Sequence, residues 1–295
     1  MAQEKKATVR DIAKKAEVSV ATVSYVLNDK EGTKISEATR KKVLQVANLL
    51  NYSIPEKYKN TGSQKNSYSL GIIYSLDSLT PSRNIEIMNL VNLLAERFGR
   101  MKFNCLLLPI EPDLEEYEPI QGLDGIIAID LKEHDFKKIS GSYYVPVLCL
   151  DMMINDFLFY QIHSDIEKLV NKAGDTLGKD FYLVTDKYHN EGYQTYISSA
   201  VPKGRALIFS ELNKKELSSL KNKKLLALGT FLGTALLQYA PADNILVISG
   251  DDNDQPYGVG LRSIHNDLEK KANLAMSIMM NALERKFDIK HEYKI

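Results

Sequence analysis

The sequence predicts a small all-α domain followed by a larger two-lobed α/β domain with parallel sheets. Three observations support this fold class: apolar residues recur at helical spacing near the amino terminus, a polar segment follows, and short apolar strands then alternate with helical segments. At 295 residues the chain is too long for one average domain and long enough to bury a sizeable core. We therefore expect domains at 1–55 and 69–295, joined by a linker at 56–68.

Charge is unevenly distributed along the chain, although the formal net charge is zero. Residues 1–60 carry twelve basic and seven acidic side chains, against 26 basic and 31 acidic ones in the rest of the chain. Only the amino-terminal part is therefore charged to suit a polyanion such as DNA, although an excess of this size also fits a solvated basic face.

Three short helices are expected in the first domain. Thr8 and Asp11 have the spacing of a capping box, and a first helix follows them. Ser19 caps a second helix over 20–27, and Ser36 caps a third helix that runs to about residue 50. The tight connection between the first two helices predicts helix-turn-helix geometry, in which the second helix lies in the major groove of DNA.

This segment resembles the head of LacI-family transcription regulators. The resemblance covers about residues 7–55 and rests on the runs Thr8–Ala13, Val18–Ser24, Val26–Asn28 and Ile35–Arg40. It implies that Val20, Ala21 and Tyr25 face the DNA bases. It also implies contacts to the DNA backbone from a second set of residues: Thr8, Ser19, Thr22, Ser24, Asn28, Lys34, Ser36 and Thr39.

Two positions depart from the LacI pattern. Glu17 stands where the family commonly has glycine in the turn, which brings a carboxylate near the phosphates. Tyr25 stands where the family often has arginine, the side chain best suited to bidentate contact with guanine. We therefore expect the base preference of this head to differ; alternatively, Tyr25 packs on the helix surface without touching a base.

The linker is polar and rich in helix-breaking residues. In LacI-like proteins the segment after its proline folds into a hinge helix on DNA and places a leucine in the minor groove. In this linker no leucine follows Pro55, and Asn60-Thr61-Gly62 is poor helix sequence. We therefore expect no leucine wedge in the minor groove here. That Tyr58 partly replaces this leucine is a hypothesis.

From residue 69 onward, apolar strands alternate with helices in two series. Strands are expected near 70–74, 105–108, 125–129, 145–150, 181–184, 206–209, 225–228 and 245–248, with a helix around 85–98. Such alternation predicts parallel sheets with helices on both faces. Ligands of such folds bind beyond the carboxyl ends of the strands, between the lobes.

The body resembles the periplasmic-binding-protein-like sensor of the LacI family, at Gly122–Ile127, Val145–Asp151, Val247–Asp252 and Leu261–Ile264. In that family the aspartate at position 251 commonly binds sugar hydroxyls, as does an arginine at the position of His189. The resemblance therefore implies Asp251 and His189 as effector-binding residues. The structural alternatives are a loop cap for Asp251 and a surface position for His189.

Other classes of protein are disfavoured. The sequence has no P-loop, no His-Glu-x-x-His motif and no Cys/His cluster with metal spacing, so we expect no enzyme, cofactor or metal. Cys105 and Cys149 lie in apolar runs, which suits unpaired thiols in a reducing compartment. The chain has no apolar run long enough to span a membrane and no secretory signal at its start, so a cytoplasmic protein at the bacterial nucleoid is expected.

The resemblance implies a transcription regulator, usually a repressor, that binds a palindromic operator in double-stranded DNA as a homodimer. The helix around 85–99 is a candidate dimer interface, and the last ten residues are too few for a coiled-coil tetramer. Two hypotheses for the body remain open. Either a small sugar-like effector moves the lobes, or the body binds no sugar and serves dimerisation or a protein partner.

Overall fold

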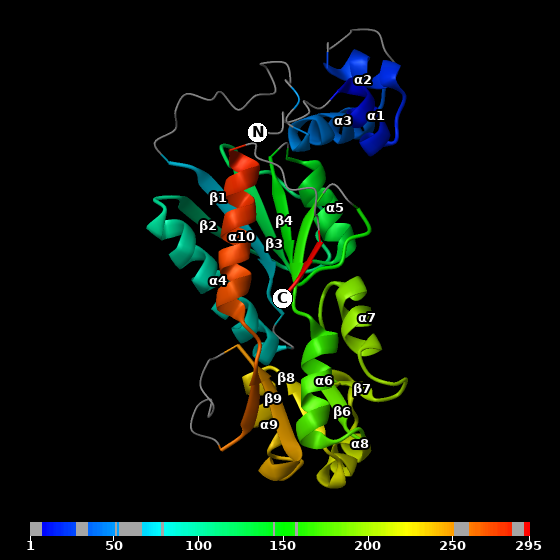
Figure 1. Ribbon diagram of the computed structural model, residues 1–295, viewed down its shortest axis with the longest axis vertical. Helices are drawn as coiled ribbons and strands as arrows, with labels where there is room; N and C mark the ends of the chain where they lie inside the picture. Colours follow the sequence, from blue (N-terminus) through cyan, green and yellow to red (C-terminus); the bar gives the residue numbers. More distant parts are fainter. Residues whose placement is uncertain are drawn as a thin grey trace, which may run out of the picture.

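The computed structural model describes most of the chain, namely residues 8–27, 35–50, 52, 67–77, 80–143, 145–156, 159–250, 260–284 and 292–295. Three helices are followed by an α/β body with two parallel sheets, so the fold class predicted from the sequence is confirmed (Figure 1). Most of the expected linker, including Tyr58, lies outside the described residues.

The head consists of three helices, which are α1 (Val9–Ala16), α2 (Val20–Leu27) and α3 (Glu37–Leu49). Each begins directly after its expected cap. Thr8 and Asp11 form a complete capping box, while Ser19 Oγ and Ser36 Oγ each accept a hydrogen bond from the backbone N–H three residues on, at 3.0 and 3.1 Å. Such caps satisfy backbone N–H groups that have no partner inside the helix, and this fixes where each helix starts.

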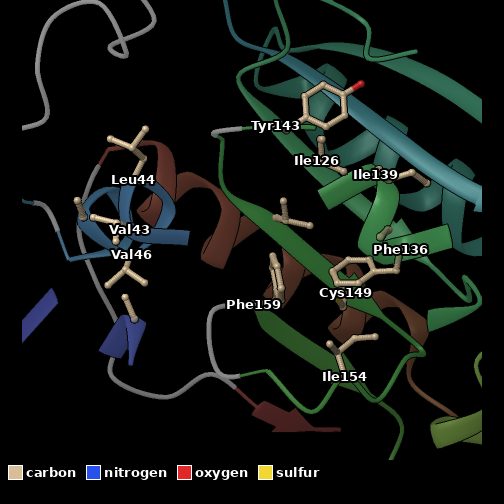
Figure 2. Packing of buried hydrophobic residues seen from close by; sticks show 14 of the residues in the cluster. Val43, Leu44, Val46, Ile126, Phe136, Ile139, Tyr143, Cys149, Ile154 and Phe159 are labelled. Atoms are coloured by element: carbon tan, nitrogen blue, oxygen red, sulfur yellow. The ribbon is translucent and has the colours of Figure 1, made fainter. Parts of the chain in front are cut away.

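The core of the head is made of short aliphatic side chains contributed by all three helices. The buried residues are Ile12, Ala13, Ala16, Val23, Val26, Leu27, Val43, Leu44, Val46 and Ala47. Val43, Leu44 and Val46 are drawn on α3 in Figure 2. The buried positions on α1 and α2 are those expected from helical spacing, so the opposite side of α2 is left outward.

The first lobe is built on a sheet with the strand order β11-β5-β4-β3-β1-β2. Its strands are β1 (Ser69–Ser75), β2 (Asn104–Ile110), β3 (Gly125–Ile129), β4 (Val147–Leu150), β5 (Tyr160–His163) and β11 (Glu292–Lys294). Every pairing in this sheet is parallel. The carboxyl ends of its strands therefore lie at one edge, which is the edge that faces the second lobe (Figure 1).

Helices cover both faces of the first sheet: α4 (Pro81–Arg100) and α10 (Leu268–Leu283) pack together on one face, and α5 (Glu133–Gly141) lies on the other. Alternate residues of each strand point to opposite faces. On β3, Ile127 packs toward α4 and α10, whereas Ile126 joins Phe136 of α5 in the cluster of Figure 2. The inner strands β1, β3 and β4 are buried on both sides, which explains why their sequences are largely apolar runs.

The second lobe repeats this plan around a smaller parallel sheet with the order β10-β9-β8-β6-β7. Its strands are β6 (Tyr182–Thr185), β7 (Ala206–Ile208), β8 (Leu225–Leu228), β9 (Ile245–Ser249) and β10 (Arg262–His265). Helices α6 (Ile166–Leu177) and α7 (Glu191–Ser199) contribute to the core on one face, and α8 (Lys214–Ser219) and α9 (Thr230–Leu236) to that on the other.

The chain passes between the lobes after β5 and again after β10. The sequence analysis did not predict β5, because its middle and last residues, Gln161 and His163, are polar. Both are buried in the structure. The Gln161 side chain exchanges two hydrogen bonds with the backbone of Ile154, at 2.7 and 2.8 Å, so a polar residue is satisfied inside a buried strand.

The carboxyl-terminal strand β11 was also missed, since its three residues carry no apolar pattern. It pairs with β5, and the last residue continues the pairing toward the crossing point. The Ile295 backbone N–H donates to the His163 carbonyl at 3.1 Å, and the Asp165 N–H donates to the Ile295 carbonyl at 2.7 Å. The end of the chain thus holds the first crossing between the lobes.

Candidate functional site

One side of α2 is outward, and we call the surface formed by Val20, Ala21 and Tyr25 the α2 face. Val20 is 47% exposed, Tyr25 is 38% exposed and Ala21 is exposed as well. The other side of α2 is buried in the head core. The three residues that the sequence analysis assigned to the DNA bases are therefore brought together on one accessible surface.

Hydroxyl groups gather at the starts of the head helices. Ser19 Oγ and Thr22 Oγ1 lie 2.8 Å apart at the start of α2, and Ser36 Oγ and Thr39 Oγ1 lie 2.8 Å apart at the start of α3. The Thr8 hydroxyl donates to Asp11 at the start of α1. The amino-terminal end of a helix carries partial positive charge and outward N–H groups, so hydroxyls placed there suit phosphate oxygens.

The backbone of the turn between α1 and α2 shows why glycine is common in the LacI pattern at the position where this chain has Glu17. Glu17 has a left-handed backbone, with φ of 54° and ψ of 41°, and its N–H donates back to the end of α1. Glycine adopts this conformation without the steric penalty of a Cβ atom. The Glu17 carboxylate pairs with Lys42 of α3 at 3.1 Å, so its charge is partly neutralised within the head.

Three predicted site residues, Asn28, Lys34 and Asp251, lie outside the described residues. Ser24 is half-buried on α2 beside the α2 face. The remaining effector residue of the sequence analysis, His189, is described and lies at the junction of the lobes. Its environment is built from the ends of two neighbouring strands.

Asp130 and Asp151 directly follow β3 and β4. Each has φ of 50°, a left-handed conformation that few residues other than glycine adopt, and each is buried. Because the two strands are adjacent and parallel, both carboxylates lie at the strand ends that face the second lobe. Backbone strain of this kind persists only where surrounding interactions enforce it, and these two positions carry such interactions.

Two buried cations balance these carboxylates. Arg83 of α4 donates from Nε to Asp130 Oδ2 at 3.0 Å, and its Nη2 lies 3.7 Å from Asp151 Oδ2. Lys271 of α10 donates to Asp151 Oδ1 at 2.6 Å and to Ser164 Oγ at 2.9 Å. We call Arg83, Asp130, Asp151 and Lys271 the interlobe network.

Electrostatic effects within the network favour the charged forms of Asp151 and Arg83, whereas burial outweighs Arg83 and His189 at Asp130 and raises the pKa of that carboxyl. Burial works against ionisation of Asp151, but Lys271 and Arg83 outweigh it and hold the pKa of that carboxyl below its ordinary value. Burial also opposes the charge of Arg83, whereas Tyr188, Asp130 and Asp151 favour it and keep its pKa above the ordinary value. The Arg83 guanidinium carbon lies 4.1 Å from the centre of the Tyr188 ring in the second lobe.

Asp130 also joins the two lobes through backbone groups. Its Oδ1 accepts hydrogen bonds from the N–H groups of His189 and Asn190, at 3.0 and 3.1 Å, just before α7 of the second lobe. The Asn190 side chain donates to the Leu131 carbonyl at 3.2 Å and accepts from the Met153 N–H at 2.9 Å. The start of α7 is thereby bound to the first lobe from both sides.

Among the described residues, the remaining space between the strand ends is small. A cavity of about 30 Å³ is lined by residues of both lobes, among them Arg83, Asp151, Ser164, Tyr188, Gly229 and Asn266. A water molecule needs at least roughly 10–15 Å³ by the same kind of measure, and ligand pockets usually measure about 300–1,000 Å³. The cavity therefore has room for water but not for a sugar.

His189 does not line this cavity but an open cleft of about 710 Å³ beside α5, together with Lys132 and His134. The side chain is largely buried, and burial lowers its pKa from the ordinary value, with Asp130 acting in the opposite direction. Its backbone N–H donates to Asp130, so the backbone of His189 contributes to the lobe junction.

Sequence reasoning did not identify Arg83, Asp130, Asp151 or Lys271 as site residues. One signal was present: both aspartates come immediately after buried strands, where the carboxyl ends of a parallel sheet place functional groups. Arg83 and Lys271 had no such signal, because each lies in the first turns of an amphipathic helix.

Comparisons with known proteins support the helix-turn-helix interpretation of the head and the two-lobed fold of the body. Residues 8–55 match the family described as bacterial regulatory proteins, lacI family. The chain is 41% identical over 183 residues to the probable HTH-type transcriptional repressor ExuR of Bacillus subtilis (strain 168). It is 27% identical over 191 residues to the HTH-type transcriptional regulator MalR of Staphylococcus xylosus. These matches cover 60% and 62% of this chain, which spans about half the length of the two relatives, 51% and 54%.

Among solved structures, the lac repressor dimer bound to operator and the anti-inducer ONPF has a similar fold. The TM-score is 0.54 at 17% identity, covering 99% of this chain and 96% of that one. Head and body together define the class of proteins with a helix-turn-helix head on a two-lobed α/β body. Within that class, residues 8–55 match the lacI family of bacterial regulatory proteins, and the fold of the whole chain is similar to that of the lac repressor.

The relatives named above are transcription regulators or repressors by name. No helix in the described part of the chain is long and apolar enough to cross a membrane. Among the same residues, no group of three or more His, Cys, Asp or Glu side chains is arranged to hold a metal ion.

Proposed function

We propose that the chain is a sequence-specific DNA-binding transcription regulator that acts as a repressor. The observation that carries this proposal is the exposed α2 face on a head that matches the lacI family over residues 8–55. An α-helix fits the major groove, where apolar side chains such as Val20 and Ala21 suit thymine methyl groups. The Tyr25 hydroxyl adds a group that hydrogen-bonds to a base edge.

We assign the contacts to the DNA backbone to the polar residues around α2 and α3. These are Thr8, Ser19, Thr22, Ser24, Asn28, Lys34, Ser36 and Thr39. Support comes from the hydroxyl pairs at the starts of α2 and α3, which lie where helix ends favour anions. Such contacts fix the orientation of the head on the duplex, while the α2 face sets its base preference.

A homodimer on a palindromic operator is the arrangement we infer. Two identical heads related by a two-fold axis read two half-sites of opposite direction, and the lac repressor dimer with a similar fold is bound to an operator. We retain the division into a head (1–55), a linker (56–68) and a body (69–295), with α4 as the candidate dimer interface. A regulator of this kind works in the cytoplasm, at the bacterial nucleoid.

For the body, the small cavity favours the hypothesis that no sugar binds between the strand ends. In that case the body serves dimerisation or a protein partner. The alternative, a sugar-like effector, places Asp251 and His189 in contact with it. Because His189 lines the cleft beside α5, such an effector would bind on that side of the lobe junction.

The proposal is tested by selecting bound duplexes from a random DNA pool with the full-length protein, at several salt concentrations. We expect a palindromic consensus, and an affinity that falls with salt as phosphate contacts release counterions. Tyr25→Ala should change the preferred base at one position in each half-site. Absence of any enriched sequence at low salt would overturn the proposal.

A further inference from the structure

The interlobe network occupies the place where a ligand would join the two lobes. Its members come from four separate segments of the first lobe: the start of α4, the ends of β3 and β4, and the first turns of α10. Three of the four side chains are at most 5% exposed, and Asp151 is 7% exposed. The space beside them measures about 30 Å³. The strand ends are therefore filled by groups of the chain itself.

The network is also balanced in charge. Arg83 and Lys271 supply two positive charges, and Asp130 and Asp151 supply two negative ones. A polar ligand that entered this space would have to separate these pairs. An unpaired charge in a buried site is strongly unfavourable, so the network resists replacement by a neutral ligand such as a sugar.

The network reaches the second lobe at two points. Asp130 accepts two backbone hydrogen bonds at the start of α7, in the manner of a bound anion at a helix end. Arg83 packs its guanidinium on the Tyr188 ring. A bound ligand closes a two-lobed protein by contacting both lobes at once, and these two side chains already make contacts of that kind.

We propose that Arg83 and Asp130 act as a built-in substitute for a ligand, which holds the lobes closed when no effector is bound. The consequence for DNA rests on the proposed function: the two heads of the dimer keep one fixed arrangement, and operator binding does not respond to sugars. In this regulator, control then depends on protein abundance or on a partner rather than on lobe closure.

The first test removes the Arg83 side chain and then supplies a guanidinium group from solution. Arg83→Ala in the full-length protein leaves a guanidinium-sized void beside Asp130 and Asp151. We expect a lower Tm, and amide exchange in the peptide covering residues 186–194 that is faster by at least about tenfold. Ethylguanidinium at millimolar concentration should restore both, whereas ethylammonium at the same concentration should restore neither.

Arg97→Ala is the matched control. Arg97 lies on the same helix, is partly buried, and pairs with Glu269 and Asn273 of α10, all within the first lobe. Its loss should leave exchange of the 186–194 peptide unchanged and should give no response to ethylguanidinium. If Arg97→Ala and Arg83→Ala behave alike, the proposal is wrong.

Asp130→Asn provides a second variant of nearly the same shape, should Arg83→Ala fail to fold. It keeps an oxygen for the two backbone N–H groups at α7 but presents a neutral amide to Arg83. We expect faster exchange of the 186–194 peptide without rescue by ethylguanidinium, because no void has been made. Unchanged exchange in this variant would overturn the role of Asp130.

Two further measurements separate this proposal from the proposed function. The Tm of the wild-type protein should not change when pentoses, hexoses or their phosphates are added. A ligand that binds the native state would raise it. A saturable rise that Arg83→Ala abolishes would overturn the built-in substitute. Operator affinity should respond to ethylguanidinium in Arg83→Ala only. If the exchange and melting results are as expected but no duplex is bound, the DNA-binding function is contradicted. The proposal that Arg83 and Asp130 hold the lobes closed is then still supported.

Discussion

On the α2 face, Val20 and Tyr25 present much of their surface to the outside, whereas between the lobes Arg83 and Asp130 are buried and paired with each other. The two regions therefore differ in whether their functional groups are exposed or are buried and paired within the chain. A surface that recognises a separate partner keeps its groups outward until that partner arrives. A space whose charges are already paired offers a new ligand few unsatisfied charges, although Arg83 Nη2 is buried without a hydrogen bond.

Backbone strain shows the same contrast. Glu17 in the head and Asp130 and Asp151 between the lobes all have left-handed backbones. The two aspartates are buried among ion pairs and hydrogen bonds that offset this strain. Glu17 is exposed and has one ion pair with a partly exposed lysine, an interaction that contributes little in water. The interlobe conformation is thus enforced by buried side-chain interactions, whereas the Glu17 turn is held by backbone hydrogen bonds to the end of α1 and an exposed ion pair.

The largest expected effect concerns the α2 face. Val20→Glu places a carboxylate against base edges and phosphates, and we expect operator affinity to fall by about 100-fold or more. Val20→Gln, which has the same length but no charge, should lose less than about tenfold. Fluorescence anisotropy with the selected duplex at fixed salt measures both. Equal affinity of Val20→Glu and wild type would show that α2 does not lie on DNA.

The next effect concerns the close approach of the lobes. A Cβ atom at Gly192 of α7 would lie 2.9 Å from the Met153 carbonyl oxygen in the first lobe, so Gly192→Ala should destabilise the protein by about 1–3 kcal/mol. Gly174→Ala in α6, where a Cβ atom meets nothing within 4 Å, should instead stabilise it by about 0.5–1 kcal/mol. Thermal melting of the full chain distinguishes the two. A gain in both variants would mean that the lobes do not meet at Gly192.

The head was predictable in detail from sequence, because its structure follows from local rules. Thr8, Ser19 and Ser36 mark the helix starts, and the spacing of residues such as Val23 and Val26 marks the buried side of α2. The strands of the body were predictable for a similar reason, since parallel strands buried on both faces are short apolar runs. In both cases the information lies within a few neighbouring residues.

The interlobe network was not predictable in this way. Arg83 and Asp130 are 47 positions apart, and Lys271 and Asp151 are 120 apart, so their pairing depends on the complete fold. Lys271 in particular has the sequence context of an ordinary helical lysine, yet it is 1% exposed. The family resemblance implied Asp251 and His189 as effector-binding residues, and not the residues that fill the space here.

A smaller effect tests the strain at the turn of the head. Glu17→Gly removes the steric cost of the left-handed conformation, which exceeds the weak ion pair lost with it, and should stabilise the head by about 0.5–1 kcal/mol. Amide exchange in peptides covering α1 and α2 should slow by about threefold. Glu17→Gln keeps the strain and loses the charge, so it should not slow exchange. Equal slowing in both variants would identify charge, and not backbone conformation, as the cause.

The smallest effect is a pH dependence at the lobe junction. Burial lowers the pKa of His189 in the folded protein, so as pH falls below about 6.5 the unfolded chain binds a proton that the folded chain takes up only at lower pH. Stability that is present above this pH is therefore lost on acidification. His189→Gln should make the decline in Tm between pH 7 and 5 shallower. A decline of equal slope in wild type and His189→Gln would mean that the ring is already accessible to protons, as expected for lobes that open freely. That result would weaken the contrast between an exposed head surface and a closed lobe junction.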